Sequence, residues 1–512
     1  MPFTIPPGLA RKTHERVMYY FREKMCGIPR GSGKEQKIAD YLVEFAREHG
    51  LECERGNGTV NGKQIYNVVI RKPATAGYEN LDPVIVQSHI DMVCQKANGS
   101  AHDFDRDPIS ASVSGDGRFM TAAGTTLGAD DGIGAACALA ILESGGIAHP
   151  PVEALFTSDE EDGMGGAIAA CAGDGGFIRG RRLINIDTDA EGTLFCGCAG
   201  GINATLRLPV RREPVPGGHA LLKAELTGLA GGHSGTEIHK GRANAHVLMA
   251  RALHAVGGEL PLSLAAFAGG DKRNVITREA WAVIAVEEKS ADDAVKLFRA
   301  QEKIFAHEYA GIENCGIAFA VRPADGAAAR TVLSRESLDR LLAAIIAMPN
   351  GVLAMHGKVA GLVETSCNLG IARLEEDHVY LCSLIRSFLR TKKLYVLEQM
   401  RQIAWLAGAA FSVDNDYPQW EPNPNSELAA RFARAYQSAF PDAKGAGLPQ
   451  MKSIHAGLEC GYFAERFPDM DMIACGPTIT GAHTTEETLD IFSVERLVRL
   501  LIVVLGEMGK VK

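Results

Sequence analysis

Apolar residues in the first 190 positions occur in short runs that are separated by segments with helical spacing. The spacing predicts helices at residues 12–25 and 34–49, and Gly50 is a typical helix stop. A Gly- and Ala-rich segment at 132–144 predicts a helix that packs closely on a sheet. Apolar runs bounded by turns predict strands at 65–71, 83–88, 152–157 and 182–187. This alternation favours an α/β fold with a mixed, largely parallel sheet flanked by helices.

The pattern changes after about residue 200. Alternating polar and apolar residues predict half-exposed strands at 203–210 and 220–228, and a helix at 242–256 and a strand at 280–288 follow. This pattern is typical of an α+β unit rather than of a parallel sheet.

A similar order of helix, strand, Asn-containing loop and strand recurs around residues 335–386. The segments that contain Asn274 and Asn368 both place an asparagine before an expected strand. We interpret this as a duplication inside the second region.

From about residue 400 the first pattern returns. It predicts a helix at 426–438, a Gly-rich loop at 445–461 and a final helix at 493–507. The simplest arrangement is a catalytic α/β domain interrupted by an inserted α+β domain. The expected segments are 1–200 and 401–512 for the catalytic domain and 201–400 for the insertion.

Bulk properties restrict the function only broadly. A chain of 512 residues is too long for one ordinary core, so two or more domains are expected. The net charge of -9 argues against generic binding to nucleic acid or to an anionic membrane. We find neither an apolar run of ~20 residues nor the order of a signal peptide. The 12 cysteines show no framework spacing, which favours reduced thiols and a cytoplasmic location.

Residue types that suit metal ions recur along this framework. Four of the five motifs that carry them stand where a strand is expected to end, so side chains from different strands could converge on one point. Mixed imidazole and carboxylate ligands suit Zn²⁺, and two imidazoles with several carboxylates are enough for a two-metal site. The candidate ligands are His89, Asp130, Glu161, Asp187 and His483.

The individual motifs suggest different roles. His89 and Asp91 would face the same side of an extended segment, so the carboxylate could orient the imidazole. Asp130 could bridge two metal ions through its two oxygens, although an acid there could also cap the next helix. Of Glu160 and Glu161, one could bind a metal while the other acts as base toward a metal-bound water. Each motif alone has an ordinary structural explanation, so the hypothesis depends on their joint occurrence.

The motifs HIDMV, GADDGIG, SDEEDGMGG, INIDTDAEG and GAHTTEE occur in this order. The sequence therefore resembles the co-catalytic zinc exopeptidases of the aminoacylase and carboxypeptidase G superfamily. The stretches TTLGADDGIGAA, CGCAGG, GLAGGHSGTEIHKGRANA and IHAGLECG are similar to its aminoacyl-histidine dipeptidase branch, the bacterial cytosolic non-specific or Xaa-His dipeptidases. The resemblance covers essentially the whole chain.

The resemblance implies two zinc ions per chain. His89 and Asp187 would bind one ion, Glu161 and His483 the other, and Asp130 would bridge them. Glu160 would be the general base toward the bridging water, and Asp91 would orient His89. The sequence has Asp131 where the branch commonly has Asn, which leaves open which Asp bridges. Mn²⁺ or Co²⁺ could substitute for zinc.

The same resemblance assigns the inserted domain a role as a lid and in dimerisation. His233, in GGHSG, would donate to the scissile carbonyl oxygen and stabilise the oxyanion. Arg386 would hold the free C-terminal carboxylate of the substrate, and Asn274 would add a polar contact. Catalysis would then need domain closure, and the chain would form a homodimer through this domain.

The implied activity is hydrolysis of unblocked dipeptides, including Xaa-His dipeptides such as carnosine. An N-acyl amino acid deacylase of the same superfamily would use the same metals, so the ligands do not separate the two. An aminopeptidase acting on longer peptides is a further alternative. A binding or scaffold protein without activity is disfavoured, because every expected motif is present.

Overall fold

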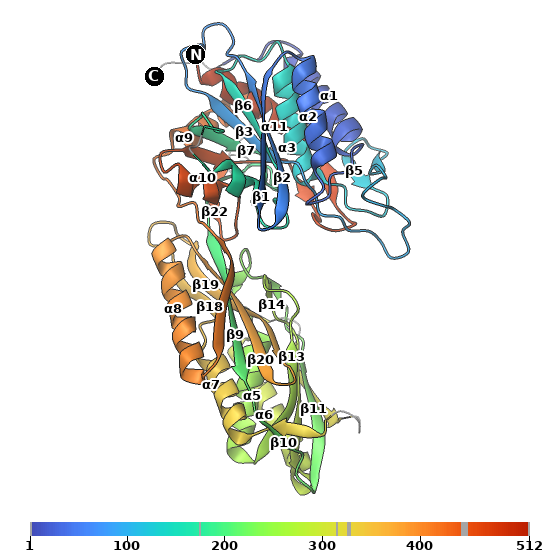
Figure 1. Ribbon diagram of the computed structural model, residues 1–512, viewed down its shortest axis with the longest axis vertical. Helices are drawn as coiled ribbons and strands as arrows, with labels where there is room; N and C mark the ends of the chain where they lie inside the picture. The colour runs from blue at the N-terminus through green and yellow to red at the C-terminus, as the bar shows by residue number, and fades with distance from the viewer. Residues whose placement is uncertain (1–2, 174–175, 314–315, 325–328, 442–448, 510–512) are drawn as a thin grey trace. The chain divides into compact units, whose positions relative to one another are not determined.

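The computed structural model describes residues 3–173, 176–313, 316–324, 329–441 and 449–509 (Figure 1). The chain divides into two compact units, which are described separately. Unit 1 comprises Met1–Gly197, Trp420–Ser453 and Leu458–Lys512, and unit 2 comprises Cys198–Gln419 and Ile454–Gly457. The first residues of the expected Gly-rich loop, 445–448, lie outside the described part of the chain.

A mixed sheet of eight strands forms the centre of unit 1, in the order β1-β2-β6-β3-β7-β23-β8-β22. The strands are β1 (Glu52–Val60), β2 (Lys63–Lys72), β3 (Val84–His89), β6 (Val152–Thr157), β7 (Arg182–Asn185), β8 (Thr193–Cys198), β22 (Gln450–Ile454) and β23 (Asp471–Ala474). The neighbours β6, β3, β7 and β23 are parallel. Strands β1 and β2 are antiparallel to their neighbours at one edge. The predicted α/β fold class is confirmed.

One face of this sheet shares a hydrophobic core with five helices. Alternate strand residues such as Val68, Val86 and Ile184 point into it, as the two-residue period of a strand requires. The helices are α1 (Leu9–Tyr20), α2 (Gln36–Glu48), α3 (Ala129–Glu143), α9 (Glu427–Ala439) and α11 (Ile491–Glu507). Helix α3 is buried along nearly its whole length, because its small Ala and Gly residues let it approach the sheet closely.

The remaining elements of unit 1 are short. Helix α4 (Gly165–Ala170) contacts β1, β2 and β6, and α10 (Cys460–Arg466) contacts α4. A π-helical turn, η1 (Phe21–Met25), continues α1, so the helix predicted at 12–25 is present in two parts. A second sheet has the order β24-β25-β5-β4. Its strands are β4 (Ala111–Val113), β5 (Phe119–Ala122), β24 (Ile479–Thr480) and β25 (Thr488–Asp490).

Unit 2 is built on a nine-stranded sheet in the order β16-β11-β15-β13-β19-β20-β9-β21, with β18 paired to β19. Its strands are β9 (Gly200–Pro209), β11 (His219–Thr227), β13 (Leu262–Gly269), β15 (Ala280–Glu287), β16 (Ala318–Pro323), β18 (Gly351–Met355), β19 (Val363–Leu374), β20 (His378–Ser387) and β21 (Ala410–Tyr417). The helices are α5 (Ala245–Glu259), α6 (Ala291–Glu308), α7 (Arg335–Ala347) and α8 (Arg390–Ala407), and side chains of all four share one core with the sheet.

The topology of unit 2 shows an internal duplication. One half runs β11-α5-β13-β15-α6-β16 and the other runs β9-α7-β19-β20-α8-β21. The strand order of the first half repeats that of the second in reverse, and the halves join where β13 pairs with β19. The asparagines compared in the sequence are not equivalent, since Asn274 precedes the short strand β14 (Val275–Ile276) and Asn368 lies inside β19.

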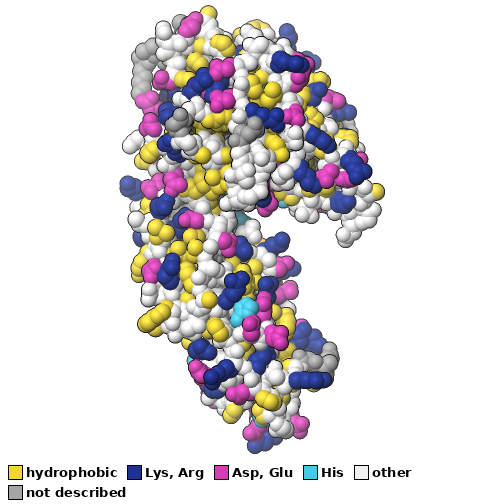
Figure 2. Space-filling model, viewed as in Figure 1, with side chains coloured by type: hydrophobic (Ala, Val, Ile, Leu, Met, Phe, Trp, Pro, Cys, Tyr) yellow, Lys and Arg dark blue, Asp and Glu magenta, His cyan; other side chains and the backbone are white. Residues whose placement is uncertain are grey.

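The described helices include none that is long and apolar enough to cross a membrane. On the face shown in Figure 2, lysine and arginine side chains are interspersed with acidic ones rather than gathered in one patch. This face offers no extended basic surface of the kind that nucleic-acid binding requires.

Candidate active site

Four candidate site residues of unit 1 lie at the carboxyl ends of three neighbouring parallel strands. His89 is the last residue of β3, Glu160 and Glu161 follow β6, and Asp187 follows β7. Strand β3 pairs with β6 on one side and with β7 on the other. Because parallel strands end at the same edge of a sheet, these side chains come together although they are distant in the sequence.

Asp130 and His483 reach this point from outside the sheet. Asp130 is the second residue of α3. His483 lies in the turn between β24 and β25 and has a positive φ of 64°. Asp130 Oδ1 lies 3.1 Å from His89 Nε2, and Asp130 Oδ2 lies 3.2 Å from His483 Nε2. One carboxylate therefore faces both imidazoles, one with each oxygen.

The ligand atoms form two groups that share Asp130. The first contains His89, Asp130 and Asp187, and the second contains Asp130, Glu161 and His483, with the atoms of each group within 4.8 Å of one another. His89 Nε2 lies 3.8 Å from Asp187 Oδ1, and His483 Nε2 lies 3.0 Å from Glu161 Oε1. A third group with the same spacing contains His89, Glu160 and Glu161.

The electrostatics of these groups fit divalent cations. Burial and neighbouring acids raise the pKa of Asp187 and of Glu160 well above the ordinary carboxyl range. Hydrogen bonds to Asp130 and Glu161 raise the pKa of His483 to about 11. Gathering several buried carboxylates costs free energy unless cations compensate their charge. Imidazole and carboxylate donors together suit zinc, so the residues present match the metal that the resemblance implies.

Asp91 connects the imidazole of His89 with the loop of the glutamates. It is fully buried, and its Oδ1 lies 3.3 Å from His89 Nδ1. Its two oxygens accept the backbone N–H groups of Glu160 at 3.1 Å and Glu161 at 3.2 Å, and Ser32 Oγ donates to it at 2.8 Å. Asp91 is therefore placed to fix the orientation of His89.

Asp131 has a different environment from Asp130. It is buried, and its Oδ1 accepts the backbone N–H of Gly134 at 3.1 Å, as a helix cap does. In the part of the chain that the structure describes, Asp131 belongs to none of the groups with ligand spacing. The geometry thus favours Asp130 as the shared carboxylate.

Several buried charged residues near the site were not singled out from the sequence. Glu459 Oε2 accepts hydrogen bonds from Gln87 at 2.6 Å and Thr157 at 2.7 Å, and burial raises its pKa to about 7. Arg30 and Glu487 are also buried. In a sequence, a buried charged residue in a turn cannot be distinguished from a solvent-exposed one. No local pattern therefore marks these three residues.

The residues expected to contact substrate lie in unit 2, and two of them are neighbours. A Cβ atom on Gly235 would lie 3.0 Å from His233 Cε1 and 3.3 Å from Arg386 Cζ. Glycine at this position therefore lets both side chains approach the same point. His455, which was not singled out from the sequence, lies near them: burial and the charge of Arg386 lower the pKa of His455 to about 3.

His233 is suited to donate a hydrogen bond. Its Nδ1 accepts the backbone N–H of Thr236 at 3.1 Å, so the proton of the neutral ring belongs on Nε2. Burial and the nearby Arg386 lower the pKa of His233 to about 4. The ring is therefore neutral near pH 7 and presents an N–H donor.

Arg386 is a buried cation. It is 5% exposed, and its Nη1 donates to the Tyr417 hydroxyl at 2.9 Å. Its Nε has no hydrogen-bond partner among the described residues. A buried guanidinium with an unused donor favours binding of an anionic group.

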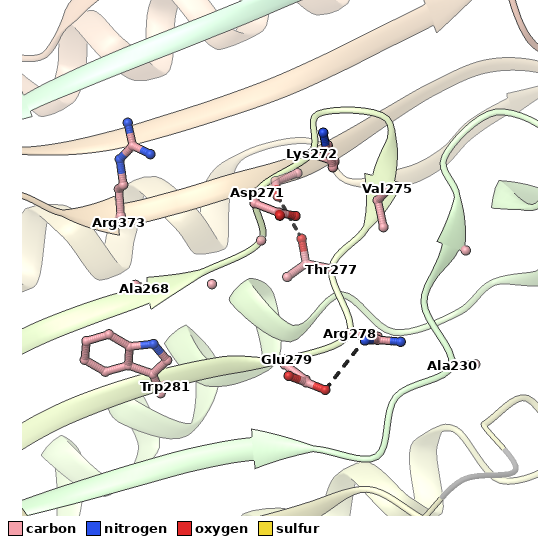
Figure 3. A pocket seen from close by; sticks show the side chains of 14 residues that line it. Ala230, Ala268, Asp271, Lys272, Val275, Thr277, Arg278, Glu279, Trp281 and Arg373 are labelled. Atoms are coloured by element: carbon pink, nitrogen blue, oxygen red, sulfur yellow. Dashed lines mark hydrogen bonds and ion pairs between the residues drawn. The ribbon is translucent and has the colours of Figure 1, made fainter. Parts of the chain in front are cut away.

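Asn274 lies in the turn before β14, which pairs with β12 (Gly232–His233). Its carbonyl accepts the backbone N–H of Ser234 at 2.8 Å, so the structure brings it beside the segment of His233. Beside this pair of strands is a cavity of about 550 Å³. Figure 3 shows Lys272, Val275 and Trp281 around it.

The chain matches the model of peptidase family M20/M25/M40 over residues 85–506. It therefore belongs to this family and is a hydrolase of peptide bonds. The resemblance inferred from the motifs is confirmed.

Individual relatives agree with this assignment. The chain is 42% identical over 484 residues, which are 94% of this chain and 96% of the relative, to the cytosol non-specific dipeptidase of Escherichia coli (strain K12). It is similar to the aminoacylhistidine dipeptidase of Vibrio alginolyticus with a TM-score of 0.82 and 38% identity, covering 96% of each chain. Aminopeptidase PepT of Bacillus cereus shares the fold, with a TM-score of 0.54, 15% identity and coverage of 97% of this chain and 99% of that one.

Proposed function

We propose that this chain is a cytosolic, zinc-dependent dipeptidase that hydrolyses unblocked dipeptides, Xaa-His dipeptides such as carnosine among them. The observation that carries the proposal is the Asp130 carboxylate, shared between two groups of ligand residues. The Escherichia coli and Vibrio alginolyticus relatives are both dipeptidases, which supports a dipeptide as substrate.

In this proposal His89 and Asp187 would hold one zinc ion, Glu161 and His483 would hold the other, and Asp130 would be shared between them. Zinc would supply a Lewis acid that polarises the scissile carbonyl and lowers the pKa of water. Asp91 keeps His89 in the orientation and tautomer that leave Nε2 free to act as a ligand.

Glu160 acts as the general base and then as the general acid. It stands beside Glu161 and within ligand distance of His89 without belonging to the two groups that share Asp130. It takes a proton from the attacking water and returns it to the leaving amine.

Residues of unit 2 bind the substrate in this proposal. The neutral His233 donates from Nε2 to the carbonyl oxygen as negative charge develops on it. Arg386 pairs with the free C-terminal carboxylate, and Asn274 adds a polar contact.

A panel of matched substrates tests the proposed function. The zinc-loaded protein should release amine from Ala-His and Ala-Ala, but not from Ala-Ala-Ala or N-acetyl-Ala, because its substrate has both a free amine and a nearby carboxylate. Chelator should abolish the activity, and added zinc should restore it. Turnover of N-acetyl-Ala without Ala-Ala would move the assignment to a deacylase, and turnover of Ala-Ala-Ala would move it to an aminopeptidase.

Replacement of Glu160 separates the base from the ligands. Glu160→Ala should lower kcat by about 10²–10⁴-fold, because proton transfer is lost, while the zinc content stays near that of the wild type. Asp162→Ala is the matched control, since Asp162 is in the same loop and its side chain is 73% exposed. Rate assays are combined with metal analysis of the purified proteins. Equal loss of zinc and activity in Glu160→Ala would contradict the assigned roles.

Replacement of Arg386 tests carboxylate binding. Arg386→Ala should raise KM for free dipeptides by about 10–100-fold, as expected when a charge-assisted hydrogen bond is lost. C-terminally amidated dipeptides should be affected much less. Arg373→Ala provides a control cation on β19 of the same sheet, with a side chain that is 54% exposed. Equal effects on free and amidated substrates would remove the proposed role.

The proposal includes a homodimer formed through unit 2. The side chains of Trp405 and Leu406 at the end of α8 are 74% and 75% exposed, which is unusual for large apolar residues on a monomer surface. Light scattering of the full chain should give twice the mass of 54.7 kDa. Trp405→Glu should shift the mass to that of one chain. A wild-type mass equal to that of one chain would contradict the dimer.

A further inference from the structure

One buried carboxylate accepts hydrogen bonds from every backbone N–H of the turn that ends at Asp130. Glu487 Oε2 accepts from Leu127 at 2.8 Å and from Gly128 at 2.9 Å. Glu487 Oε1 accepts from Ala129 at 2.8 Å and from Asp130 at 3.3 Å. Glu487 is 2% exposed, so water does not compete for these donors.

A buried guanidinium holds the same turn through its carbonyl side. Arg30 Nη2 donates to the Gly128 carbonyl at 2.5 Å. Arg30 Nη1 donates to the carbonyls of Asp91 at 2.7 Å and Ile90 at 3.2 Å, which directly follow His89. Arg30 is 1% exposed, and all four of these residues belong to unit 1.

Gly128 is the point where both contacts meet. Its φ is 69°, a conformation that L side chains rarely adopt. A Cβ atom there would lie 2.6 Å from Arg30 Nη2 and 2.9 Å from Met92 Sδ. Only glycine allows the guanidinium to reach the backbone of this turn.

The contacts of Glu487 and of Arg30 connect Asp130 to two different imidazole-bearing segments. Glu487 follows His483 by four residues in a turn closed by the hydrogen bond from Glu487 N to Thr484 O at 3.2 Å. Arg30 connects the turn with the end of β3, where His89 stands. The backbone of Asp130 is thus fixed relative to both segments that carry an imidazole.

We propose that Glu487 and Arg30 are positioning residues that hold Asp130 in place between the two metal ions. This inference rests on the proposed two-metal site. Glu487 sets the distance between Asp130 and His483, so its loss weakens the site of Glu161 and His483. Arg30 sets the distance between Asp130 and His89, so its loss weakens the site of His89 and Asp187.

A glutamine at position 487 removes the charge and half of the acceptor capacity. A carboxylate oxygen becomes an NH₂ group, which faces two backbone donors instead of accepting from them. Replacing such outer partners of metal ligands weakens metal binding by about 10–100-fold. We expect this loss in one of the two zinc affinities, while the other changes little.

The experiment is a zinc titration of the chelator-stripped full chain against a chromophoric chelator. Glu487→Gln should bind one zinc as the wild type does and the second about 10–100-fold more weakly, with activity regained at high zinc. Glu486→Gln is the matched control, because it makes the same change at the exposed neighbouring residue and should leave both affinities unchanged. Glu487→Asp, which keeps the carboxylate, should recover part of the lost affinity.

Two further variants assign the affected site. In a His483→Ala background, which has already lost the second site, Glu487→Gln should leave the remaining zinc affinity unaltered. Arg30→Lys should weaken the other site, since an ammonium has three donors and cannot replace the guanidinium, which donates to four carbonyls, those of Met25, Ile90, Asp91 and Gly128. Thermal unfolding of the zinc-free proteins shows whether a variant is folded.

The outcomes separate this inference from the proposed function. If the wild type binds fewer than two zinc ions, the two-metal site itself fails. If the wild type binds two and a folded Glu487→Gln binds both within twofold of wild-type affinity, the positioning role is overturned. A variant with a lower Tm but unchanged zinc affinities would show Glu487 to be a helix cap only.

Discussion

The placement of one carboxylate between two imidazoles is the constraint on which the rest of the site depends. Asp130 can face His89 and His483 at 3.1 and 3.2 Å only because three separate segments of unit 1 are held in register. The parallel strands fix His89 at the end of β3, and the buried helix α3 fixes Asp130. The carboxylate has little freedom to move, because both neighbouring layers are part of one core.

This geometry concentrates negative charge where water is scarce, and the fold compensates for that charge locally. The oxygens of Asp91 accept hydrogen bonds from backbone N–H groups and from Ser32. The oxygens of Glu487 accept hydrogen bonds from the backbone of the turn that ends at Asp130. Buried acids that are satisfied in this way are rigid, since any displacement would leave several donors unpaired. Rigidity of this kind suits a metal site, whose ligand distances vary by only a few tenths of an ångström.

Sequence reasoning predicted the elements that carry periodic signals and the ligand set that carries a motif order. The helices α2, α9 and α11 are predicted because their apolar residues recur at helical spacing. The strands β2, β3 and β6 are predicted because each is an apolar run bounded by turns, and β3 and β6 are buried at every position. The roles of Arg30 and Glu487 are not predicted, because the local sequence around a buried charged residue in a turn does not differ from that around a solvent-exposed one. The extension of unit 2 to Gln419 follows from the pairing of β21 with β9, a contact between residues about 200 positions apart in sequence that local patterns do not encode.

The duplicated half of unit 2 is inserted into the other half, between β9 and α7, and this has a consequence for folding. Strand β9 can pair with β20 only after the whole insertion has been synthesised, since the pair of Pro209 and His378 spans it. The inserted half is continuous in sequence, and its ends are joined where β10 (Arg212–Pro214) pairs with β17 (Thr331–Leu333). Once that pair forms, the half that contains β9 and β20 has to close a short gap rather than a long loop. The entropic cost of pairing β9 with β20 is therefore lower. The interrupted half can therefore assemble around a preformed partner as synthesis proceeds.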